Sequence, residues 1–293
     1  MHIKESPSRK AFNVFNICFM LFMIVITLYP IYYVVMASLS NSSELMAHQG
    51  ILLKPAGFSL NAYKEVLNNP NIWTGYKNTI IILVGSVATS MFLTCLCAYV
   101  LSRKGVLFNG AITMFIMITM FFHGGMIPTY LVVDGLGLTN TYWALILPTA
   151  LSTYNMIIMR TGFAAIPESL EESAKIDGAS QWTILFKIVI PLAKPTMAVI
   201  TLYYAVSCWN SWFNAMIYMQ KRKDLQPLQL VLRSILIENS MSDMGGGDMG
   251  DQEGIAETIK YAVIIVSTLP ILAAYPFLQK YFVKGIMIGA VKG

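Results

Sequence analysis

The sequence predicts an all-α membrane protein, and two observations support that prediction. The 293 residues are 56% hydrophobic and only 12% charged, with a mean hydropathy of +0.61, whereas soluble domains carry roughly 25% charged residues. The apolar residues also fall into long runs without acidic or basic side chains, close to the roughly 20 residues that cross a bilayer as one helix. No soluble domain fits beside these runs, so we expect one transmembrane domain over residues 1–293.

Six charge-free runs define six expected transmembrane helices. The expected helices cover approximately residues 12–38, 78–102, 108–131, 142–160, 196–218 and 260–280. The first run is too long for the apolar part of a signal peptide and lacks a small-residue cleavage site, so we expect it to be retained. Four prolines within the runs are expected to kink or end helices: Pro30, Pro128, Pro148 and Pro270.

Basic residues are distributed unevenly between the two sides of this topology. With the N-terminus in the cytoplasm, the inner segments hold 12 of the 20 Lys and Arg residues and five acids, a net charge of +7. The outer segments have a net charge of −2. Because cytoplasmic loops are enriched in Lys and Arg, we expect both termini and the connection 163–195 inside, and the connection 220–259 outside. The overall charge of +5 is thus a sign of orientation, not of nucleic-acid binding.

Neither the cysteines nor the acidic outer segment has the spacing of a metal site. All four cysteines lie inside apolar runs, where they are expected to pack as small hydrophobic residues. The glycine-rich segment 241–254 contains aspartates, but not at the spacing of an EF-hand. We interpret it as a flexible, solvated loop, with contact to a partner protein as the alternative. The sequence predicts no metal site and no catalytic residue.

The inner connection 163–195 contains the signals of a first short helix. Pro167 and Glu168 open it, because proline suits the first helical position and acids suit the first turn. Glu171 and Lys175 are expected to form an i,i+4 pair that supports it. Gly178 ends it, because the residue just after a helix commonly has a positive φ, which glycine adopts without steric cost.

A second helix follows almost at once. Ser180 can cap its first turn, and the helix is expected to run to Pro191. The connection is therefore predicted to be a structured helix–turn–helix at the membrane surface. An ordinary amphipathic hairpin is the plain interpretation of this pattern, and a docking element for another protein is the functional one.

The same segment resembles the EAA loop of ABC-importer permeases. In that family, Glu-Ala-Ala is followed by three residues, glycine, nine residues and Ile-x-Leu-Pro; here ESAKIDG at 172–178 and IVIP at 188–191 keep that spacing. Ser173 replaces alanine and Ile190 replaces leucine, both mild changes of size. With Asp177 before the glycine, the segment is most similar to the loops of carbohydrate importers.

Two further segments are similar to sugar permeases, so the resemblance covers nearly the whole chain. They are MIPTYLVVDGLGLTNTYWALILP at 126–148 and YFVKGIMIGAVKG at 281–293. The resemblance is greatest to importers of polysaccharide-derived oligosaccharides, alginate among them. It implies a type I ABC importer permease fold in the inner membrane. It also implies a second homologous permease, two ATP-binding subunits and an extracytoplasmic solute-binding protein as partners.

The resemblance assigns coupling to the EAA-like loop and ATP hydrolysis to the partners. This chain has no G-x-x-x-x-G-K-[ST] sequence, so ATP and Mg are expected to bind the partner subunits and no cofactor to bind here. The helix 167–177 is expected to enter a cleft of one ATPase, with glutamates as acceptors and Ala174 allowing close approach. The expected coupling residues are Glu171, Glu172, Ala174, Asp177, Gly178 and Pro191.

The fifth run holds the densest mixture of aromatic and amide side chains. Sugars bind by stacking on aromatic rings and by hydrogen bonds to amides, so we expect this run to line the solute pathway. On one continuous helix, Tyr203, Asn210 and Asn214 would share a face, with Trp209 beside them and Trp212 turned away. The alternative is an aromatic belt at the membrane surface.

Three alternatives to a sugar importer remain open. The chain could belong to a permease for another solute class. An ion-coupled secondary transporter is the second alternative, but none of the six runs contains the Asp or Glu that a coupling-ion site commonly uses. A membrane scaffold or receptor subunit is the third, and the absence of ATP-dependent transport by its complex would identify it.

Overall fold

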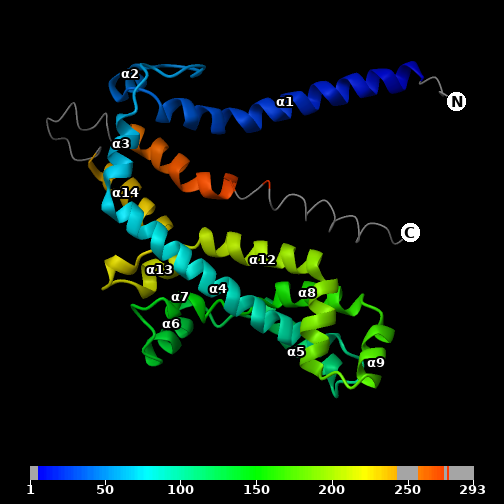
Figure 1. Ribbon diagram of the computed structural model, residues 1–293. Coiled ribbons are helices and arrows are strands. Elements are labelled where there is room, and N and C mark those ends of the chain that lie inside the picture. Colours follow the sequence, from blue (N-terminus) through cyan, green and yellow to red (C-terminus); the bar gives the residue numbers. More distant parts are fainter. Residues whose placement is uncertain (1–5, 243–256, 274–275, 277–293) are drawn as a thin grey trace. The chain divides into compact units, whose positions relative to one another are not determined.

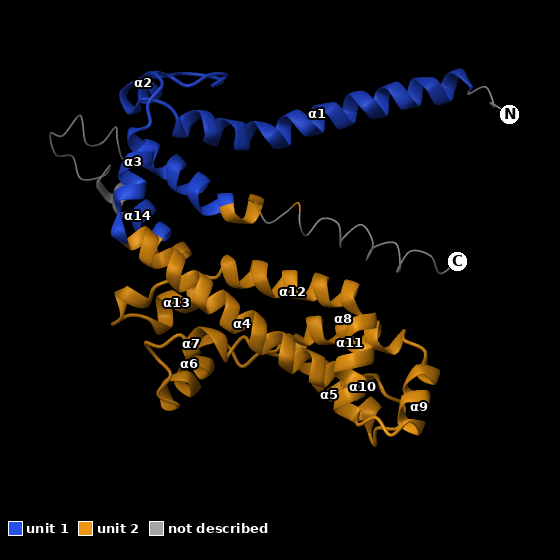
Figure 2. Cartoon of the chain, viewed as in Figure 1, with its two compact units in different colours: residues 1–70, 232–269 blue, residues 71–231, 270–293 orange. Residues whose placement is uncertain are grey.

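The computed structural model describes residues 6–242, 257–273 and 276, and most of them are helical (Figure 1). These residues include no β-strand, and one isolated bridge joins Ser40 to Phe58. The all-α prediction is confirmed. The chain divides into two compact units, residues 1–70 with 232–269 and residues 71–231 with 270–293 (Figure 2).

The first unit begins with helices α1 (Pro7–Ser38), α2 (Ser42–Ala47) and α3 (Asn61–Asn68). Helix α1 contains the first predicted span, and its apolar side chains are exposed along most of its length. An exposed apolar helix of 32 residues is long enough to cross a bilayer. Asn41 caps α2, since its side-chain oxygen accepts a hydrogen bond from the Ser43 amide at 3.0 Å.

The core of the first unit lies where α1 ends. Ala37 packs with Leu45 and Leu52, which are 7% and 1% exposed. Tyr33 of α1 meets Tyr261 edge to face, with ring centroids 5.8 Å apart. Tyr261 belongs to a helix over residues 257–273, the described part of the sixth predicted span.

Helix α14 (Leu228–Ser242) and the short 3₁₀ helix η2 (Lys223–Leu225) occupy the first half of the outer connection. That half of the connection is therefore ordered. The glycine-rich remainder, residues 243–256, lies outside the described residues, as does the C-terminal segment 277–293. The expectations for these two segments stay predictions.

Helix α4 (Pro70–Ser102) belongs to the second unit in all but its first residue. It covers the second predicted span but begins well before residue 78, because Pro70 is a suitable helix start. By length and composition, α1 and α4 are the helices of the described chain that could each cross a membrane alone. Two bent pairs also qualify if each pair is one span: α5 (Asn109–Phe121) with α6 (Met126–Gly135), and the stretch from α10 to α11 (Gln181–Leu192) with α12 (Lys194–Trp209).

The third predicted span is broken. Helix α5 (Asn109–Phe121) and helix α6 (Met126–Gly135) meet at an angle of 109°. The break contains Gly124 and Gly125. Gly125 has φ +91°, a backbone conformation that is strained for any residue with a side chain. The run over 108–131 therefore forms a bent pair of helices, because these two glycines interrupt it, and its crossing of the membrane as one span stays a prediction.

The fourth predicted span is also broken. The one-turn helix α7 (Trp143–Ile146) precedes Pro148, and helix α8 (Thr153–Ala164) begins after Ser152. Proline has no amide hydrogen for the helix and clashes with the preceding turn. Ser152 caps α8 by accepting a hydrogen bond from the Asn155 amide at 3.4 Å. The expected helix over 142–160 is thus two helices.

Helix α8 packs closely on helix α12 (Lys194–Trp209). At their contact, a Cβ atom added to Gly162 would lie 2.7 Å from Thr196 Oγ1. Small residues at such a contact let two helix backbones approach each other. Helices α8 and α12 flank the connection 163–195 along the chain, so this contact fixes the two ends of that connection.

Candidate functional site

Helix α9 (Glu168–Ile176) is the first helix of the EAA-like loop, and it ends as the sequence predicts. Gly178 has φ +79°. Its amide donates to the Lys175 carbonyl at 3.0 Å, and the Ala179 amide donates to the Ala174 carbonyl at 2.9 Å. This pair of bonds is the Schellman motif, which satisfies the last carbonyls of a helix and fixes the direction of the chain that follows.

The second helix of the loop begins at the predicted cap. The Ser180 hydroxyl accepts a hydrogen bond from the Thr183 amide at 3.2 Å. Helix α10 (Gln181–Ile184) continues through a π-helical turn (Leu185–Val189) into α11 (Ile190–Leu192). The chain then bends by 86° into α12, where Pro195 occupies the first turn.

Glu171 is buried and does not pair with Lys175. It is 3% exposed, and its carboxylate forms an ion pair with Nη1 of Arg103, which follows the end of α4. The expected i,i+4 pair was wrong, because the buried carboxylate pairs instead with Arg103, which directly follows α4 in the chain. Glu168 forms a second, exposed ion pair with Lys104 at 3.0 Å.

Tyr99 makes two further contacts at the end of α4, one with Arg103 and one with the loop. The Arg103 guanidinium carbon lies 4.7 Å from the centre of the Tyr99 ring. The Tyr99 hydroxyl donates to the side-chain oxygen of Gln181 at 2.7 Å. The end of α4 therefore holds both helices of the loop, α9 through Glu171 and α10 through Gln181.

The coupling residues predicted from the resemblance divide between two faces of the loop. Glu172, Asp177 and Pro191 are exposed, so they are available to a partner. Glu171 is buried and Ala174 is half-buried against the core of its own chain, so these two side chains are less accessible to a partner than Glu172 and Asp177. The exposed side of α9 also presents Ile176, which is 86% exposed.

A cavity of about 310 Å³ lies in the second unit beside α4. Its α4 wall contains Thr79, Ser86 and Ser90, which follow one another by seven and four residues and so share a face. The described residues that line it include hydroxyls, one amide and apolar groups, and no charged side chain. The full lining is Thr79, Ile82, Ser86, Ser90, Leu145, Thr149, Tyr204, Ser207, Cys208, Ser211, Asn214 and Pro227.

Tyr204 joins this cavity to the start of α8. Its hydroxyl accepts a hydrogen bond from the Ser152 amide at 3.1 Å and lies 2.7 Å from the hydroxyl of Thr94 on α4. Tyr204 is 7% exposed. The Tyr204 phenol thus connects α4 and α12 with Ser152, the N-cap of α8, and α8 leads directly to α9.

The predicted pathway residues do not form one face. Helix α12 ends at Trp209, and helix α13 (Phe213–Tyr218) begins after a break at 210–212. Of the predicted residues, Asn214 lines the cavity. Asn210 is exposed, and its amide donates to the Val206 carbonyl of its own helix at 2.9 Å. The shared-face prediction was wrong because it assumed an unbroken helix.

The other two predicted pathway residues lie apart from the cavity lining. Tyr203 is 39% exposed and faces the ring of Tyr154, with centroids 6.5 Å apart. Trp209 is buried near Tyr76, at a centroid distance of 6.4 Å. The residues that sequence reasoning missed are the hydroxyls of α4, whose spacing along one helix face was the available signal.

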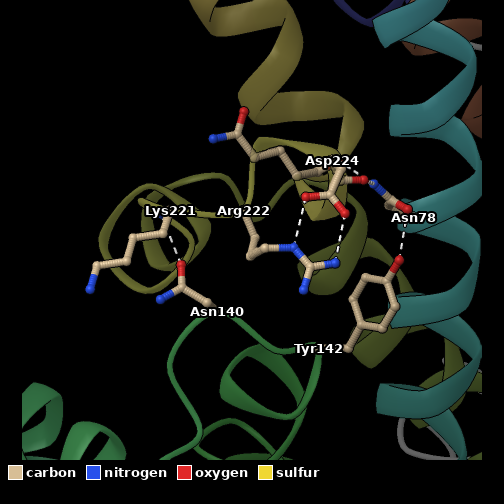
Figure 3. Close-up of polar contacts among 7 residues, drawn as sticks. Asn78, Asn140, Tyr142, Lys221, Arg222 and Asp224 are labelled. Carbon is tan, nitrogen blue, oxygen red and sulfur yellow. Dashed lines mark hydrogen bonds and ion pairs between the residues drawn. The ribbon is translucent and has the colours of Figure 1, made fainter.

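An amide cluster lies near the N-terminal end of α4, which is the outer end in the expected topology (Figure 3). The Asn78 side chain is 2% exposed and donates to the carbonyls of Asp224 and Gln226 at 2.8 and 3.0 Å. The Tyr142 hydroxyl donates to the Asn78 side-chain oxygen at 2.8 Å. The next residue, Thr79, accepts from the Leu228 amide at 2.8 Å. These bonds fix the outer connection against α4 beside the cavity.

The same connection holds a surface ion pair and a second asparagine contact (Figure 3). Arg222 donates to both carboxylate oxygens of Asp224, at 2.8 and 2.7 Å. These hydrogen bonds lower the pKa of the Asp224 carboxyl below its usual value. Asn140, with φ +61°, accepts from the Lys221 amide at 2.9 Å.

Residues 7–288 match the family described as binding-protein-dependent transport system inner membrane component. Two Bacillus subtilis (strain 168) proteins are similar over almost their full lengths. The polygalacturonan/rhamnogalacturonan transport system permease protein YtcP is 43% identical over 94% of this chain and 96% of its own. Protein LplC is 42% identical over 99% of both.

A solved structure has the same fold. It is a chain from the crystal structure of a bacterial ABC transporter involved in the import of the acidic polysaccharide alginate. The sequences are 32% identical, the TM-score is 0.86, and the match covers 96% of this chain and 100% of that one. The fold predicted from the resemblance is therefore confirmed.

Proposed function

This chain belongs to the family of binding-protein-dependent inner-membrane transport components, and we propose that it is the permease subunit of an ATP-driven oligosaccharide importer. In this proposal the chain forms part of the pathway through the membrane and does no covalent chemistry. ATP and Mg bind two partner subunits, since this sequence has no phosphate-binding loop of the G-x-x-x-x-G-K-[ST] type. A second homologous permease and an extracytoplasmic binding protein complete the complex.

The observation that carries the proposal is the rigid construction of the EAA-like loop. A loop that transmits motion must keep its shape, and the Schellman turn at Gly178 and the Ser180 cap fix the angle between α9 and α10. The buried Glu171–Arg103 pair fixes the loop to α4. Its exposed side offers Glu172 and Ile176, a charge and an apolar side chain, to the cleft of an ATPase.

Motion of the loop has a direct route to the cavity. Helix α8 begins at the Ser152–Tyr204 contact on the cavity wall and ends just before α9. Movement of α9 with a closing ATPase would therefore move the start of α8 and the Tyr204 wall together. This is a rigid-body transition of packed helices between two arrangements.

The cavity suits a solute that offers many hydroxyl groups. Hydroxyls and the Asn214 amide can both donate and accept hydrogen bonds, and Ile82, Leu145 and the Tyr204 ring supply apolar contact. We propose an oligosaccharide as the solute. An acidic one, such as a fragment of alginate, is the specific candidate, because the similar solved transporter imports that acidic polysaccharide.

The proposed orientation places both termini and the EAA-like loop in the cytoplasm. Ser242→Cys and Lys187→Cys in a cysteine-free background test it, because the first lies in the outer connection and the second in the loop. A membrane-impermeant thiol reagent should label Ser242→Cys in intact cells and Lys187→Cys only in inverted vesicles. The reverse pattern would contradict the orientation.

The function itself is tested by purifying the complex and measuring ATP hydrolysis. The chain should co-purify with two ATP-binding subunits and a second permease, and oligosaccharide-loaded binding protein should stimulate their ATPase activity. Uptake that continues in vesicles without ATP would identify an ion-coupled transporter instead. A stable complex that transports nothing would indicate a scaffold or receptor subunit.

A further inference from the structure

A second cavity lies at the opposite end of α4 from the amide cluster, next to the EAA-like loop. Its volume is about 500 Å³. It is enclosed by the last turns of α4, the residues that follow them, the end of α9 and the start of α10. The lining residues are Leu96, Tyr99, Val100, Arg103, Gly105, Val106, Lys175, Gln181, Trp182 and Leu185.

The α4 wall of this cavity changes from apolar to cationic along the helix. Leu96, Val100 and Arg103 follow one another by four and three residues, so they share one face. They span about 10 Å along the helix axis, at 1.5 Å per residue. The charge-free run of α4 ends at Ser102, and Arg103 follows it. This end of the cavity therefore lies where the hydrocarbon of a bilayer gives way to head groups.

Arg103 has hydrogen-bonding capacity left at the cationic end. Its Nη1 atom pairs with Glu171, whereas its Nε and Nη2 atoms are buried and have no hydrogen-bond partner among the described residues. A buried donor without an acceptor is costly. An anion in the cavity would supply the missing acceptors.

A second cation faces the same space. Lys175, from the last turn of α9, lines the cavity and is exposed, and it forms no ion pair within the described part of the chain. The Glu171 carboxylate is compensated by Arg103. The other acids of α9 and its C-cap, Glu168, Glu172 and Asp177, are not among the lining residues, so the balance of charge in the cavity is positive.

We propose that this cavity binds the phosphate head group of an anionic phospholipid. The phosphate would accept hydrogen bonds from Arg103 and attract Lys175, since guanidinium groups pair well with phosphate and basic pockets near membrane surfaces bind anionic head groups. An acyl chain would lie along Val100 and Leu96. The half-exposed Trp182 indole, 58% exposed, would contact the glycerol region, where tryptophan is enriched.

Such a lipid would join α4, α9 and α10 at one point. All three helices already meet there through Glu171, Tyr99 and Gln181. The bound lipid would strengthen this junction without contacting the solute cavity. The proposal therefore does not depend on which solute is transported.

Native mass spectrometry of the purified, assembled importer tests the proposal. The complex is reconstituted in nanodiscs of phosphatidylcholine with one-fifth phosphatidylglycerol and then released. The parent complex should retain phosphatidylglycerol, and Lys175→Gln should lower its apparent affinity about fivefold, the effect of one basic residue near an anionic surface. Lys187→Gln is the matched control, because Lys187 is exposed on the same loop and does not line the cavity.

The outcomes separate the lipid from other occupants. Parent-like retention by Lys187→Gln, together with about fivefold weaker retention by Lys175→Gln, supports the proposal. Equal retention by all three proteins would overturn it, as would no retention by the parent, which would indicate that a partner subunit fills the cavity. Displacement of the lipid by millimolar inorganic phosphate would overturn the lipid as the occupant and assign the site to free phosphate.

Discussion

The two ends of α4 are fixed by different kinds of interaction. At the loop end, residues 99–104 hold the EAA-like loop through charges, with one ion pair buried and one exposed. At the outer end, Asn78 and Thr79 hold the outer connection through neutral hydrogen bonds to backbone groups. The cavity that we propose for the solute lies beside the outer end.

Because of this difference, the two ends of α4 are suited to different functions. A buried ion pair is strongly destabilised when one partner is removed, so the loop end responds sharply to the loss of a single charge. Each neutral hydrogen bond at the outer end contributes only modestly to stability, and several of them hold the same connection. The loop end is thus suited to move as one piece with a partner, and the outer end to keep the cavity wall in place.

The largest expected effect follows the loss of the buried acid. Glu171→Ala leaves Arg103 charged and unpaired, and should destabilise the second unit by about 3 kcal/mol. The thermal denaturation midpoint of the purified importer measures this. Glu168→Ala is the control, because its exposed pair with Lys104 should contribute less than about 1 kcal/mol. Equal effects of the two substitutions would contradict the greater contribution expected from the buried pair at the loop end.

A smaller effect is expected from the turn of the loop. Gly178→Val places a β-branched side chain at φ +79°, which should cost about 1–3 kcal/mol, although the added Cβ would meet no atom within 4 Å. The strain should therefore lower ligand-stimulated ATPase activity by altering the angle of the loop. Gly110→Val also has open space but no positive φ, so it should leave stimulation intact. Normal stimulation in Gly178→Val would contradict the account of the loop.

Transport should depend on Asn214 more than on Asn210. Asn214→Leu removes the amide from the cavity wall, and the loss of about 1–2 kcal/mol of hydrogen bonding corresponds to a roughly five- to thirtyfold lower uptake rate. Asn210→Leu removes a bond within an exposed helix end and should have little effect. Radiolabelled oligosaccharide uptake by proteoliposomes compares them. A greater loss in Asn210→Leu would place the pathway on the other side of α12.

The smallest expected effect is on the pH dependence of stability, through the ion pair at the outer end. Because Arg222 lowers the pKa of Asp224 in the folded protein, this pair stabilises the fold above the unfolded-state pKa of about 3.9. That contribution is lost as the pH falls below this value through the folded pKa. Arg222→Gln should therefore show a slightly weaker decrease in thermal midpoint between pH 5 and pH 3 than the parent. An unchanged or steeper decrease would show that the pair is not formed.

The loop could be predicted from sequence because its signals are local. Gly178, Ser180 and Pro167 each act on residues within one helical turn, so their effects do not depend on distant packing. The exception was Glu171, whose partner Arg103 follows the end of α4, far from the loop in the sequence. Local pairing rules could not choose between Arg103 and Lys175.

The cavity could not be predicted in the same way. Its walls come from segments that are far apart in sequence, and the bond between Thr79 and Leu228 joins residues 149 positions apart. The break at 210–212, which separates Asn210 from Asn214, contains neither glycine nor proline. Tyr204 offered no local sign that its hydroxyl would bind Ser152, the N-cap of α8.

The central claim is that α8 connects the cavity to the loop through Tyr204. It is tested most directly by the ratio of ligand-stimulated to basal ATPase activity in the reconstituted importer. Tyr204→Phe removes the hydroxyl that binds Ser152 and Thr94, and the ratio should fall towards one. The adjacent Tyr203→Phe should keep the parent ratio, because the Tyr203 hydroxyl has no hydrogen bond among the described residues. A parent-like ratio in Tyr204→Phe would contradict the claim.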